Sequence, residues 1–240
     1  MSVSLPGRER IIVALDFPDS TSALALVEQL GDLVQWFKVG LELYLFSGND
    51  IVHALKNRGH SVFLDLKLHD IPNTVAGAVR SVASAGADML TVHASGGRAM
   101  MAAAAEAASL LACPPKLLAV SVLTSMDAEQ LHAIGVGASP ADQVLRLAGL
   151  ASEAGISGLV ASSEEVAVLR AGFPDFTLVI PGIRPAGSAA GDQRRVATPA
   201  AAIRAGADYL VIGRPITQAA DPAGAVRSIL EEIETPPPSL

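Results

Sequence analysis

Short apolar segments alternate with longer segments of helical periodicity along the chain. Helical stretches lie near residues 20–30, 49–58, 73–85, 98–111, 141–154, 163–171, 198–205 and 221–233. Eight runs rich in Val, Ile and Leu separate them, at 11–16, 36–40, 62–67, 89–93, 117–124, 158–161, 177–181 and 209–213. Strands that alternate with helices in this way are typical of α/β proteins with a parallel sheet.

One helix-to-strand junction occurs more than once. Residues 84–94 align with residues 204–214, and residues 153–161 form a looser copy. Each copy has helical, Ala-rich sequence, then a glycine suited to the left-handed position that ends a helix, then a short β-branched run. The repetition indicates that the chain is built from similar β-α units.

Eight β-α units in 240 residues predict a (β/α)8 barrel, a TIM barrel that forms a single domain over residues 1–240. A doubly wound sheet is the alternative, but no G-x-G-x-x-G turn follows the first strand. The long connections at 125–140 and 183–197 would leave from the catalytic face of a barrel. The proline-rich tail at 235–240 is expected to be disordered.

Composition limits the possible partners. The net charge of -7, with no basic block, argues against nucleic acid, although locally concentrated cations could still bind an anion. The N-terminus lacks the apolar core of a signal peptide, and no apolar run reaches the roughly 18 residues of a membrane span. We therefore expect a cytoplasmic protein without a membrane partner. The single cysteine, Cys113, excludes an internal disulfide and a cysteine-based zinc site.

Polar residues mark the predicted carboxyl ends of the strands, where the loops of a barrel form its active site. Two of the four lysines, Lys38 and Lys67, lie there among apolar neighbours, although lysine is rarely buried without a partner. The residues at these ends are Asp16, Lys38, Asp65, Lys67, His93, Thr124 and Arg214, with Asp70 just beyond the third strand.

The third strand carries the densest charge, in FLDLKLHDIPNT at 63–74. Asp65 and Lys67 are two residues apart, so both side chains face the same side of the strand. Lys38 on the neighbouring strand could complete an alternating Lys-Asp-Lys-Asp array. A buried ion-pair network that only fixes the fold is the alternative, but such networks stabilise weakly, and convergence at the mouth favours a functional site.

The end of the chain contains a candidate phosphate site. GRPI at 213–216 follows the eighth strand, and loops after strands seven and eight of barrels commonly bind phosphate through backbone N–H groups and a helix N-terminus. Arg214 adds a bidentate cation, and the loop after strand seven brings Arg184 and then DQRR at 192–195. For Arg194 and Arg195, a solvated surface pair is an equal alternative.

The histidines lack metal-ligand spacing. His53, His60 and His132 are expected on the surface, and His69 is expected to point away from Lys67. His93 is either a packed residue of the barrel or a polar group behind the site.

These motifs together resemble the orotidine 5′-phosphate decarboxylases, in their bacterial form, over nearly the whole chain. D-x-K-x-x-D at 65–70 marks a wider superfamily of barrels, and its combination with Lys38, Gln193 and Arg214 is more specific. The matching segments are ALD at 14–16, FKVG at 37–40, FLDLKLHDIPNT at 63–74, TVHA at 91–94, SVLTSM at 121–126, PGIR at 181–184, DQ-x-R at 192–195 and GRPI at 213–216.

The resemblance implies decarboxylation of orotidine 5′-phosphate to UMP, the last step of pyrimidine nucleotide synthesis, without a metal or organic cofactor. By position, Lys67 is the proton donor to C6 of the pyrimidine, and Asp65 lies near the departing carboxylate. Lys38 and Asp16 contact the ribose hydroxyls, and Thr124 contacts the pyrimidine.

The resemblance also implies a homodimer with shared active sites. Asp70 and Thr74 would complete the site of the neighbouring subunit. The phosphate would be bound by Arg184, Gln193, Gly213 and Arg214, and its binding energy would close the strand-seven loop about Gly187 and Gly191.

Two alternatives remain. A Mg²⁺-dependent sugar-phosphate decarboxylase or aldolase of the same superfamily also carries D-x-K-x-x-D, but the pattern there has an acidic metal ligand where this chain has Lys38. A non-catalytic nucleotide-binding barrel would bind UMP without turnover, and the intact charge array argues against it.

Overall fold

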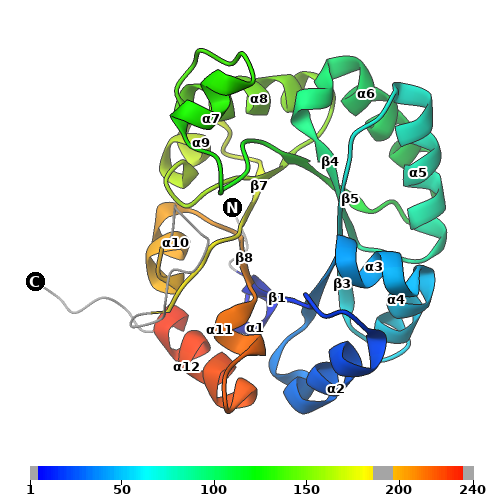
Figure 1. Ribbon diagram of the computed structural model, residues 1–240, viewed down its shortest axis with the longest axis vertical. Helices are drawn as coiled ribbons and strands as arrows, with labels where there is room; N and C mark the ends of the chain where they lie inside the picture. Colours follow the sequence, from blue (N-terminus) through cyan, green and yellow to red (C-terminus); the bar gives the residue numbers. More distant parts are fainter. Residues whose placement is uncertain (1–4, 186–196, 235–240) are drawn as a thin grey trace, which may run out of the picture.

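The computed structural model describes residues 5–185 and 197–234 (Figure 1). Several predictions fall outside these residues. They concern Gln193, the arginines at 194 and 195, the hinges Gly187 and Gly191, and the tail at 235–240.

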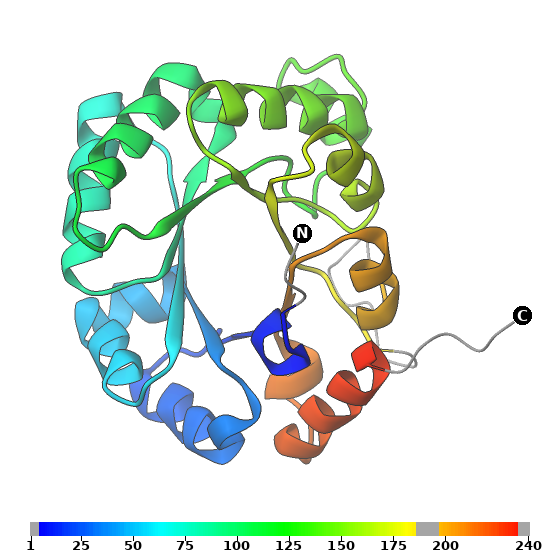
Figure 2. The ribbon, with the colours of Figure 1, turned by 180° about the vertical axis from the view of Figure 1, so that it is seen from behind.

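Eight parallel strands close into a barrel in the order of the sequence (Figures 1 and 2). Each strand pairs with the next, and the first strand pairs with the eighth. This closure confirms the predicted (β/α)8 barrel and excludes the doubly wound sheet. The strands are β1 (Ile11–Ala14), β2 (Trp36–Gly40), β3 (Ser61–Leu68), β4 (Met89–His93), β5 (Lys116–Val120), β6 (Gly158–Val160), β7 (Thr177–Ile180) and β8 (Tyr209–Ile212).

Helices surround the barrel, and each predicted helical stretch corresponds to one of them (Figure 1). Four short helices were not predicted: Gly7–Arg10, Leu41–Ser47, Ala128–Ala133 and Arg214–Thr217. The helices are α1 (Gly7–Arg10), α2 (Ser20–Leu30), α3 (Leu41–Ser47), α4 (Asn49–Lys56), α5 (Pro72–Ser84), α6 (Gly97–Ser109), α7 (Ala128–Ala133), α8 (Pro140–Glu153), α9 (Val166–Gly172), α10 (Pro199–Ala205), α11 (Arg214–Thr217) and α12 (Pro222–Glu234).

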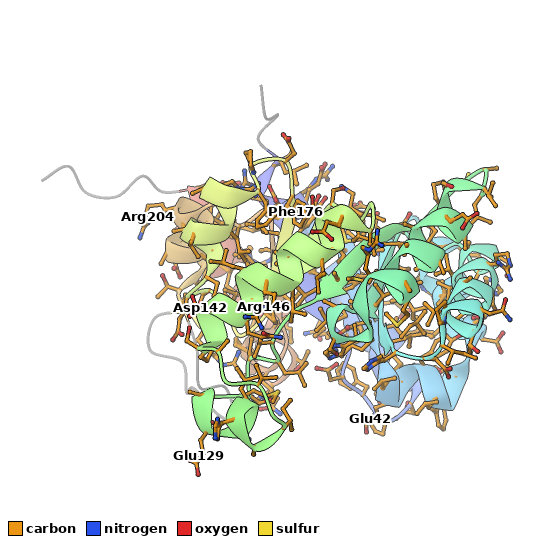
Figure 3. The ribbon with its side chains drawn as sticks, turned by 90° about the horizontal axis from the view of Figure 1, so that it is seen from above. Glu42, Glu129, Asp142, Arg146, Phe176 and Arg204 are labelled. Carbon is orange, nitrogen blue, oxygen red and sulfur yellow. The ribbon has the colours of Figure 1, made fainter. Side chains whose placement is uncertain are left out.

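Capping side chains determine where several helices begin. The carboxylate of Asp19 accepts from the Ser22 backbone N–H at the start of α2, and Ser139 and Thr198 cap α8 and α10, each just before a proline. Asp127 and Gln130 form a capping box that begins α7. The connection predicted at 125–140 therefore contains a helix, which projects at one end of the molecule with Glu129 on it (Figure 3).

Several strand boundaries differ from the prediction. β1 ends at Ala14 and β5 at Val120, so Asp16 and Thr124 lie in the loops that follow these strands. β3 extends to Leu68, one residue past the predicted end. Apolar residues continue just beyond both strands, at Leu15 after β1 and at Val122 and Leu123 after β5, which is why the apolar runs overestimate the length of these strands.

The core has an inner and an outer part, because alternate side chains of a strand face opposite ways. Ile12 and Ala14 of β1 belong to the cluster inside the barrel, whereas Ile11 and Val13 pack toward the helices. At the amino ends of the strands, the rings of Trp36 and Tyr209 meet edge to face with centroids 5.6 Å apart and pack against the inner cluster. The apolar filling leaves the polar chemistry to the carboxyl ends.

The repeated junction is a structural clamp at the amino ends of the strands. Asp88 accepts from the Val62 backbone N–H at 2.7 Å and from Lys56 at 2.8 Å. Asp208 accepts from the Leu178 backbone N–H at 2.8 Å and from the Arg170 guanidinium at 2.7 Å. Each carboxylate thus ties a preceding helix to a neighbouring strand, far from the mouth of the barrel.

The outer faces of the helices are charged. Asp142, Arg146 and Arg204 are exposed and point away from the barrel in Figure 3. In residues 5–185 and 197–234, no helix combines the length and apolar character needed to cross a bilayer.

Candidate active site

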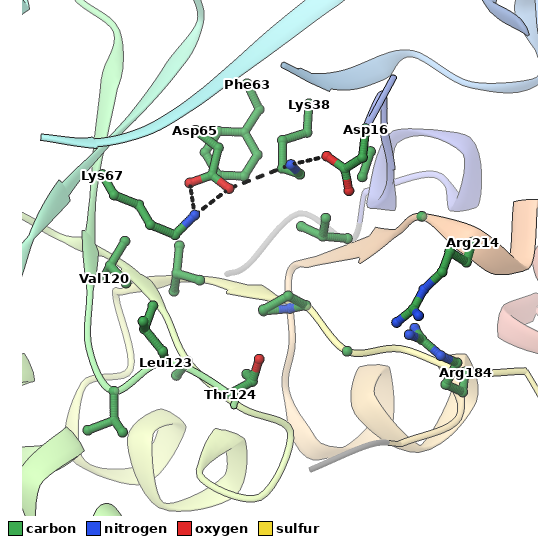
Figure 4. Close-up of a pocket in the computed structure, with 18 of the residues that line it drawn as sticks. Asp16, Lys38, Phe63, Asp65, Lys67, Val120, Leu123, Thr124, Arg184 and Arg214 are labelled. Atoms are coloured by element: carbon green, nitrogen blue, oxygen red, sulfur yellow. Dashed lines mark hydrogen bonds and ion pairs between the residues drawn. The ribbon is translucent and has the colours of Figure 1, made fainter. Parts of the chain in front are cut away.

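A cavity of about 430 Å³ lies at the carboxyl ends of the strands (Figure 4). Every predicted site residue in the described part of the chain lines it, except Asp70 and Thr74. The predicted residues in its wall are Asp16, Lys38, Asp65, Lys67, Thr124, Arg184, Gly213 and Arg214.

Four charged side chains form a row along one side of the cavity (Figure 4). The Lys67 ammonium nitrogen lies 2.9 Å and 2.8 Å from the two carboxylate oxygens of Asp65. Lys38 Nζ lies 3.7 Å from Asp65 Oδ2 and 2.9 Å from Asp16 Oδ1. The predicted grouping of Lys38, Asp65 and Lys67 is therefore confirmed. Within one chain, the second carboxylate of the row is Asp16, from the loop after β1.

The centre of this row is buried and its ends are more exposed. The side chains of Lys38 and Asp65 are 11% and 13% exposed, those of Lys67 and Asp16 33% and 61%. Burial raises the pKa of Asp65, but the charges of Lys38 and Lys67 and the hydrogen bonds from Lys67 and Thr91 outweigh it, so that pKa lies below its ordinary value. Asp65 is therefore a carboxylate at neutral pH, held between two ammonium groups.

An irregularity in β3 directs Asp65 and Lys67 toward the mouth. Leu64 pairs with Leu90 and Leu68 with Val92, so Asp65, Leu66 and Lys67 together face Thr91 alone. Lys67 has a φ of 50°, and no other non-glycine residue in the described ranges has a positive φ. This conformation costs about 1–3 kcal/mol and persists where the surroundings enforce it, often at functional sites.

Thr91 on β4 is a part of the site that the sequence interpretation missed. Its side chain is fully buried. Its hydroxyl accepts from the Lys67 backbone N–H at 2.8 Å and donates to Asp65 Oδ1 at 3.0 Å. The available signal was a hydroxyl residue in the middle of the apolar strand MLTVH.

Gly40 was also missed, although it belongs to the FKVG motif. A Cβ built on this residue would lie 3.0 Å from Lys38 Nζ and 3.3 Å from Asp16 Oδ1. Such contacts are tighter than normal packing allows. The glycine at the end of β2 therefore leaves space for the Lys38–Asp16 pair.

The opposite side of the cavity is cationic. In Figure 4 the guanidinium groups of Arg184 and Arg214 point toward one another. Arg184 is buried and donates through Nη1 to the Ile183 carbonyl at 2.8 Å, whereas Arg214 begins α11 and is exposed. Two guanidinium groups that converge in this way are suited to a phosphate or another multivalent anion.

The wall between the two charged regions is mostly apolar. Val120, Val122 and Leu123 contribute to it from the end of β5 and its loop, with the Thr124 hydroxyl among them (Figure 4). Phe63 of β3 lines the cavity beside the charged row. A planar ring with a few polar atoms could lie against this wall while the two charged regions hold its substituents.

Asp70 and Thr74 do not reach this cavity in a single subunit. Both are exposed, and the Asp70 carboxylate accepts the Ile71 backbone N–H at 2.6 Å. Asp70 instead lines a separate, more open groove together with His69 and Pro72. The site of one chain is therefore built without these two predicted residues.

Two histidine rings stack beside the site, one directly after β3 and one at the end of β4. The centroids of His69 and His93 are 5.3 Å apart, and Ser95 Oγ lies 2.7 Å from His93 Nδ1. Burial, followed by the charges of His69 and Lys67, lowers the pKa of His93. His60, expected on the surface, is half-buried, because its ring packs edge to face on that of the buried Phe37, with centroids 4.8 Å apart.

Within residues 5–185 and 197–234, no three His, Cys, Asp or Glu side chains gather in a way that could hold a metal ion. The two carboxylates in the row, Asp16 and Asp65, are each within ion-pair distance of Lys38.

Comparison with known proteins gives a consistent result. The model of the family described as Orotidine 5′-phosphate decarboxylase / HUMPS matches residues 9–229. A protein of Moorella thermoacetica named orotidine 5′-phosphate decarboxylase is 52% identical, covering 97% of this chain and 95% of that protein. One of the same name from Pseudomonas aeruginosa (strain LESB58) is 54% identical, covering 93% of this chain and 97% of that protein.

Solved structures agree with the sequence matches. The crystal structure of orotidine 5′-phosphate decarboxylase from Lactobacillus acidophilus is 38% identical with a TM-score of 0.83, covering 95% of this chain and 100% of that one. That of an uncharacterized conserved protein from Geobacillus kaustophilus is 38% identical with a TM-score of 0.82, covering 93% of this chain and 100% of that one. The chain therefore belongs to the Orotidine 5′-phosphate decarboxylase / HUMPS family.

Proposed function

We propose that the protein decarboxylates orotidine 5′-phosphate to UMP and CO₂, with Lys67 as the proton donor to C6 of the pyrimidine. Relatives with this name at 52% and 54% identity support the reaction. The observation that carries the proposal is the row Lys67–Asp65–Lys38–Asp16, which faces Arg184 and Arg214 across one cavity. Because this reaction serves nucleotide synthesis, we also assign the protein to the cytoplasm.

Lys67 is suited to the chemistry by its charge and its position. When the bond between C6 and the carboxylate carbon breaks, CO₂ leaves and the electron pair stays on C6. An ammonium group beside this carbon stabilises the developing negative charge more than it stabilises the substrate, which lowers the barrier. The ammonium then gives its proton to C6, and the amine regains a proton from solvent. Asp65, within 2.9 Å of the ammonium, holds it in place.

The remaining residues bind the rest of the substrate. Asp65 lies near the departing carboxylate, Lys38 and Asp16 contact the ribose hydroxyls, and Thr124 contacts the pyrimidine. The phosphate is bound by Arg184, Gln193, Gly213 and Arg214. The phosphate binds far from C6, so its binding energy can be used to hold the reacting ring against Lys67.

We further propose that the enzyme is a homodimer in which Asp70 and Thr74 complete the site of the partner subunit. Both are exposed and lie outside the cavity of their own chain. Large apolar side chains are exposed on α3 and directly before α5, and such patches mark interaction surfaces. They are Leu41 at 50%, Leu45 at 80%, Phe46 at 66% and Ile71 at 67% exposed.

The Mg²⁺-dependent sugar-phosphate reaction of related barrels is the second candidate, because D-x-K-x-x-D is common to both. Against it, Lys38 places an ammonium next to Asp65, where the pattern of the Mg²⁺-dependent barrels has an acidic metal ligand. A cation at this position would repel a divalent metal.

The test is the absorbance change of orotidine 5′-phosphate with purified protein in excess EDTA. Turnover under these conditions supports the proposal. Activity only after added Mg²⁺, on a sugar phosphate, would support the second candidate. Binding of UMP without any turnover would instead identify a non-catalytic barrel.

A further inference from the structure

We propose that Thr91 is a positioning residue for the decarboxylation, because its hydroxyl holds both the Lys67 backbone and the Asp65 carboxylate in their reactive arrangement. The inference rests on the proposed roles of Lys67 and Asp65. Thr91 does not line the cavity, so it acts through these two residues and not on the substrate.

The hydrogen bonds of Thr91 have a fixed direction. The Lys67 backbone N–H can only donate, so Thr91 Oγ1 accepts this bond, of 2.8 Å. The hydroxyl proton is then available for Asp65 Oδ1, 3.0 Å away, which can only accept as a carboxylate. One hydroxyl therefore joins the backbone of one residue to the side chain of the other.

This link lies where β3 departs from regular pairing with β4. Between the pairs Leu64–Leu90 and Leu68–Val92, the Lys67 N–H bonds to a side chain of the neighbouring strand and not to its backbone. Lys67 is in the left-handed region at this point, with a φ of 50°. The Thr91 hydroxyl thus supplies the acceptor that keeps this unfavourable backbone conformation in place.

Burial makes the hydroxyl hard to replace. Thr91 has 0% exposure, so water does not have free access to the two groups that it bonds. Without the hydroxyl, the Lys67 N–H would lose its acceptor and Asp65 Oδ1 would keep only the Lys67 ammonium, at 2.9 Å. We expect both residues to move away from the reactive arrangement, while the proposed phosphate site, in the segments after β7 and β8, stays intact.

The experiment compares Thr91→Val, which keeps the shape without the hydroxyl, with Thr91→Ser, which keeps the hydroxyl. For Thr91→Val we expect kcat to fall about 10- to 100-fold, with KM little changed. The magnitude is taken by analogy from residues that orient the ligands of a metal, whose replacement causes losses in this range. Thr91→Ser should recover most of the loss. The acid limb of kcat should move to higher pH in Thr91→Val, because Asp65 loses a hydrogen bond that favours its charged form.

Ser121→Ala is the matched control. Ser121 is 2% exposed, and its hydroxyl donates to the Val160 carbonyl at 2.8 Å, with no contact to the charged row. It should lower the melting temperature as Thr91→Val does, but leave kcat and the acid limb unchanged. If Thr91→Val does not fold, Thr91→Cys takes its place, because a thiol is a poor donor and acceptor.

The outcomes separate this inference from the proposed function. Unchanged kcat in Thr91→Val, together with an inactive Lys67→Ala, would overturn the role of Thr91 alone. An active Lys67→Ala would overturn the proposed function, whatever Thr91 does. Equal losses of kcat in Thr91→Val, Thr91→Ser and Ser121→Ala would show a structural role and also overturn the inference.

Discussion

The ammonium of Lys67 lies within 2.9 Å of both carboxylate oxygens of Asp65. Asp65 is the more buried partner, with its side chain 13% exposed against 33% for Lys67. The proposed proton donor is thus fixed by a carboxylate behind it and remains open to the cavity in front. This arrangement restricts the ammonium to one position, as electrostatic preorganisation requires.

Replacement of Lys67 by alanine should abolish turnover and leave the fold intact. The reason is that no other ammonium would face C6, while Asp65 would keep Lys38 as its cation. The measurements are the steady-state rate and the circular dichroism spectrum. Lys116→Ala is the control and should retain full activity, since Lys116 is exposed at the amino end of β5 and its ammonium donates to the Thr177 hydroxyl. Near-normal activity of Lys67→Ala would show that Lys67 is not the proton donor.

Stability should depend on the ionisation of Asp65. Its pKa lies below 3.8, because the charges of Lys38 and Lys67 outweigh the effect of burial. A carboxyl whose pKa is lower in the folded state stabilises the fold above its unfolded pKa, and this contribution disappears as the pH falls through the folded pKa.

We therefore expect Asp65→Asn to lower the free energy of unfolding at neutral pH, with a difference from the wild type that narrows below pH 3.8. Urea denaturation at several pH values measures this difference. Glu129→Gln, on the exposed surface of α7, should change the free energy little throughout. A difference that stays constant down to acid pH would contradict the role of ionisation.

Much of the fold and of the site could be predicted from the sequence, because local patterns of residues determine these features. The eight apolar runs and the glycine-ended junctions are set by backbone periodicity and conformation, and both were confirmed. The grouping of Lys67, Asp65 and Lys38 followed from the two-residue period of β3 and the adjacency of β2. Asp16 joins this row from the loop after β1, which the pattern of β3 does not indicate. The spacing of Asp65 and Lys67 indicated that both face one side, and their contact confirms it.

The missed features depend on relationships between strands. The hydrogen bonds of Thr91 to Lys67 and Asp65 lie at the register shift between β3 and β4, and no pattern within either strand reveals this shift. Gly40 matters because the Lys38–Asp16 pair lies within 3.3 Å of the position of its missing Cβ. The short helices α3 and α11 contain fewer than three turns, too few for a periodicity to be recognised.

Replacement of Arg214 by alanine should raise KM strongly. A hydrogen bond to a charged group is worth about 1.5–3 kcal/mol, which corresponds to a roughly 10- to 100-fold loss of affinity. Calorimetric titration with UMP and with uridine separates the causes, because only the nucleotide carries the phosphate. Arg204→Ala, on the outer face of α10, is the control and should bind UMP normally. An equal loss of affinity for UMP and for uridine would contradict a contact between Arg214 and the phosphate.

Replacement of Asp208 by asparagine should destabilise the protein without affecting the chemistry. The carboxylate accepts from Arg170 and from the Leu178 backbone at the amino end of β7, away from the cavity. Because the ion pair is partly exposed, we expect a loss of about 1–3 kcal/mol in the free energy of unfolding. Thermal and urea denaturation measure it, with kcat recorded on the same samples. A loss of kcat at full stability would refute the assignment to structure.

The proposed division of the site between two subunits can be tested by mixing two inactive variants. Lys67→Ala and Asp70→Ala subunits, exchanged into hybrid dimers, should form one native site and one doubly altered site per hybrid. With random pairing, half of the dimers are hybrids, so recovery should approach about a quarter of the wild-type rate. The assay is turnover of orotidine 5′-phosphate after co-refolding, with native mass spectrometry to count the hybrids.

Thr217→Ala provides a matched partner for the same mixing experiment. Thr217 lies at the end of α11, in the proposed phosphate region of its own chain. It is not part of the exposed apolar side chains on α3 and directly before α5. When Thr217→Ala subunits are mixed with Lys67→Ala subunits, activity should come only from the Thr217→Ala homodimers and from the one site of each hybrid that keeps Lys67. No activity should appear beyond this amount, because recovery is expected only when both parent variants are inactive. Hybrids of Lys67→Ala and Asp70→Ala that form but stay inactive would place Asp70 outside the partner's site. The exposed side chains of Phe46 and Ile71 would then need another explanation.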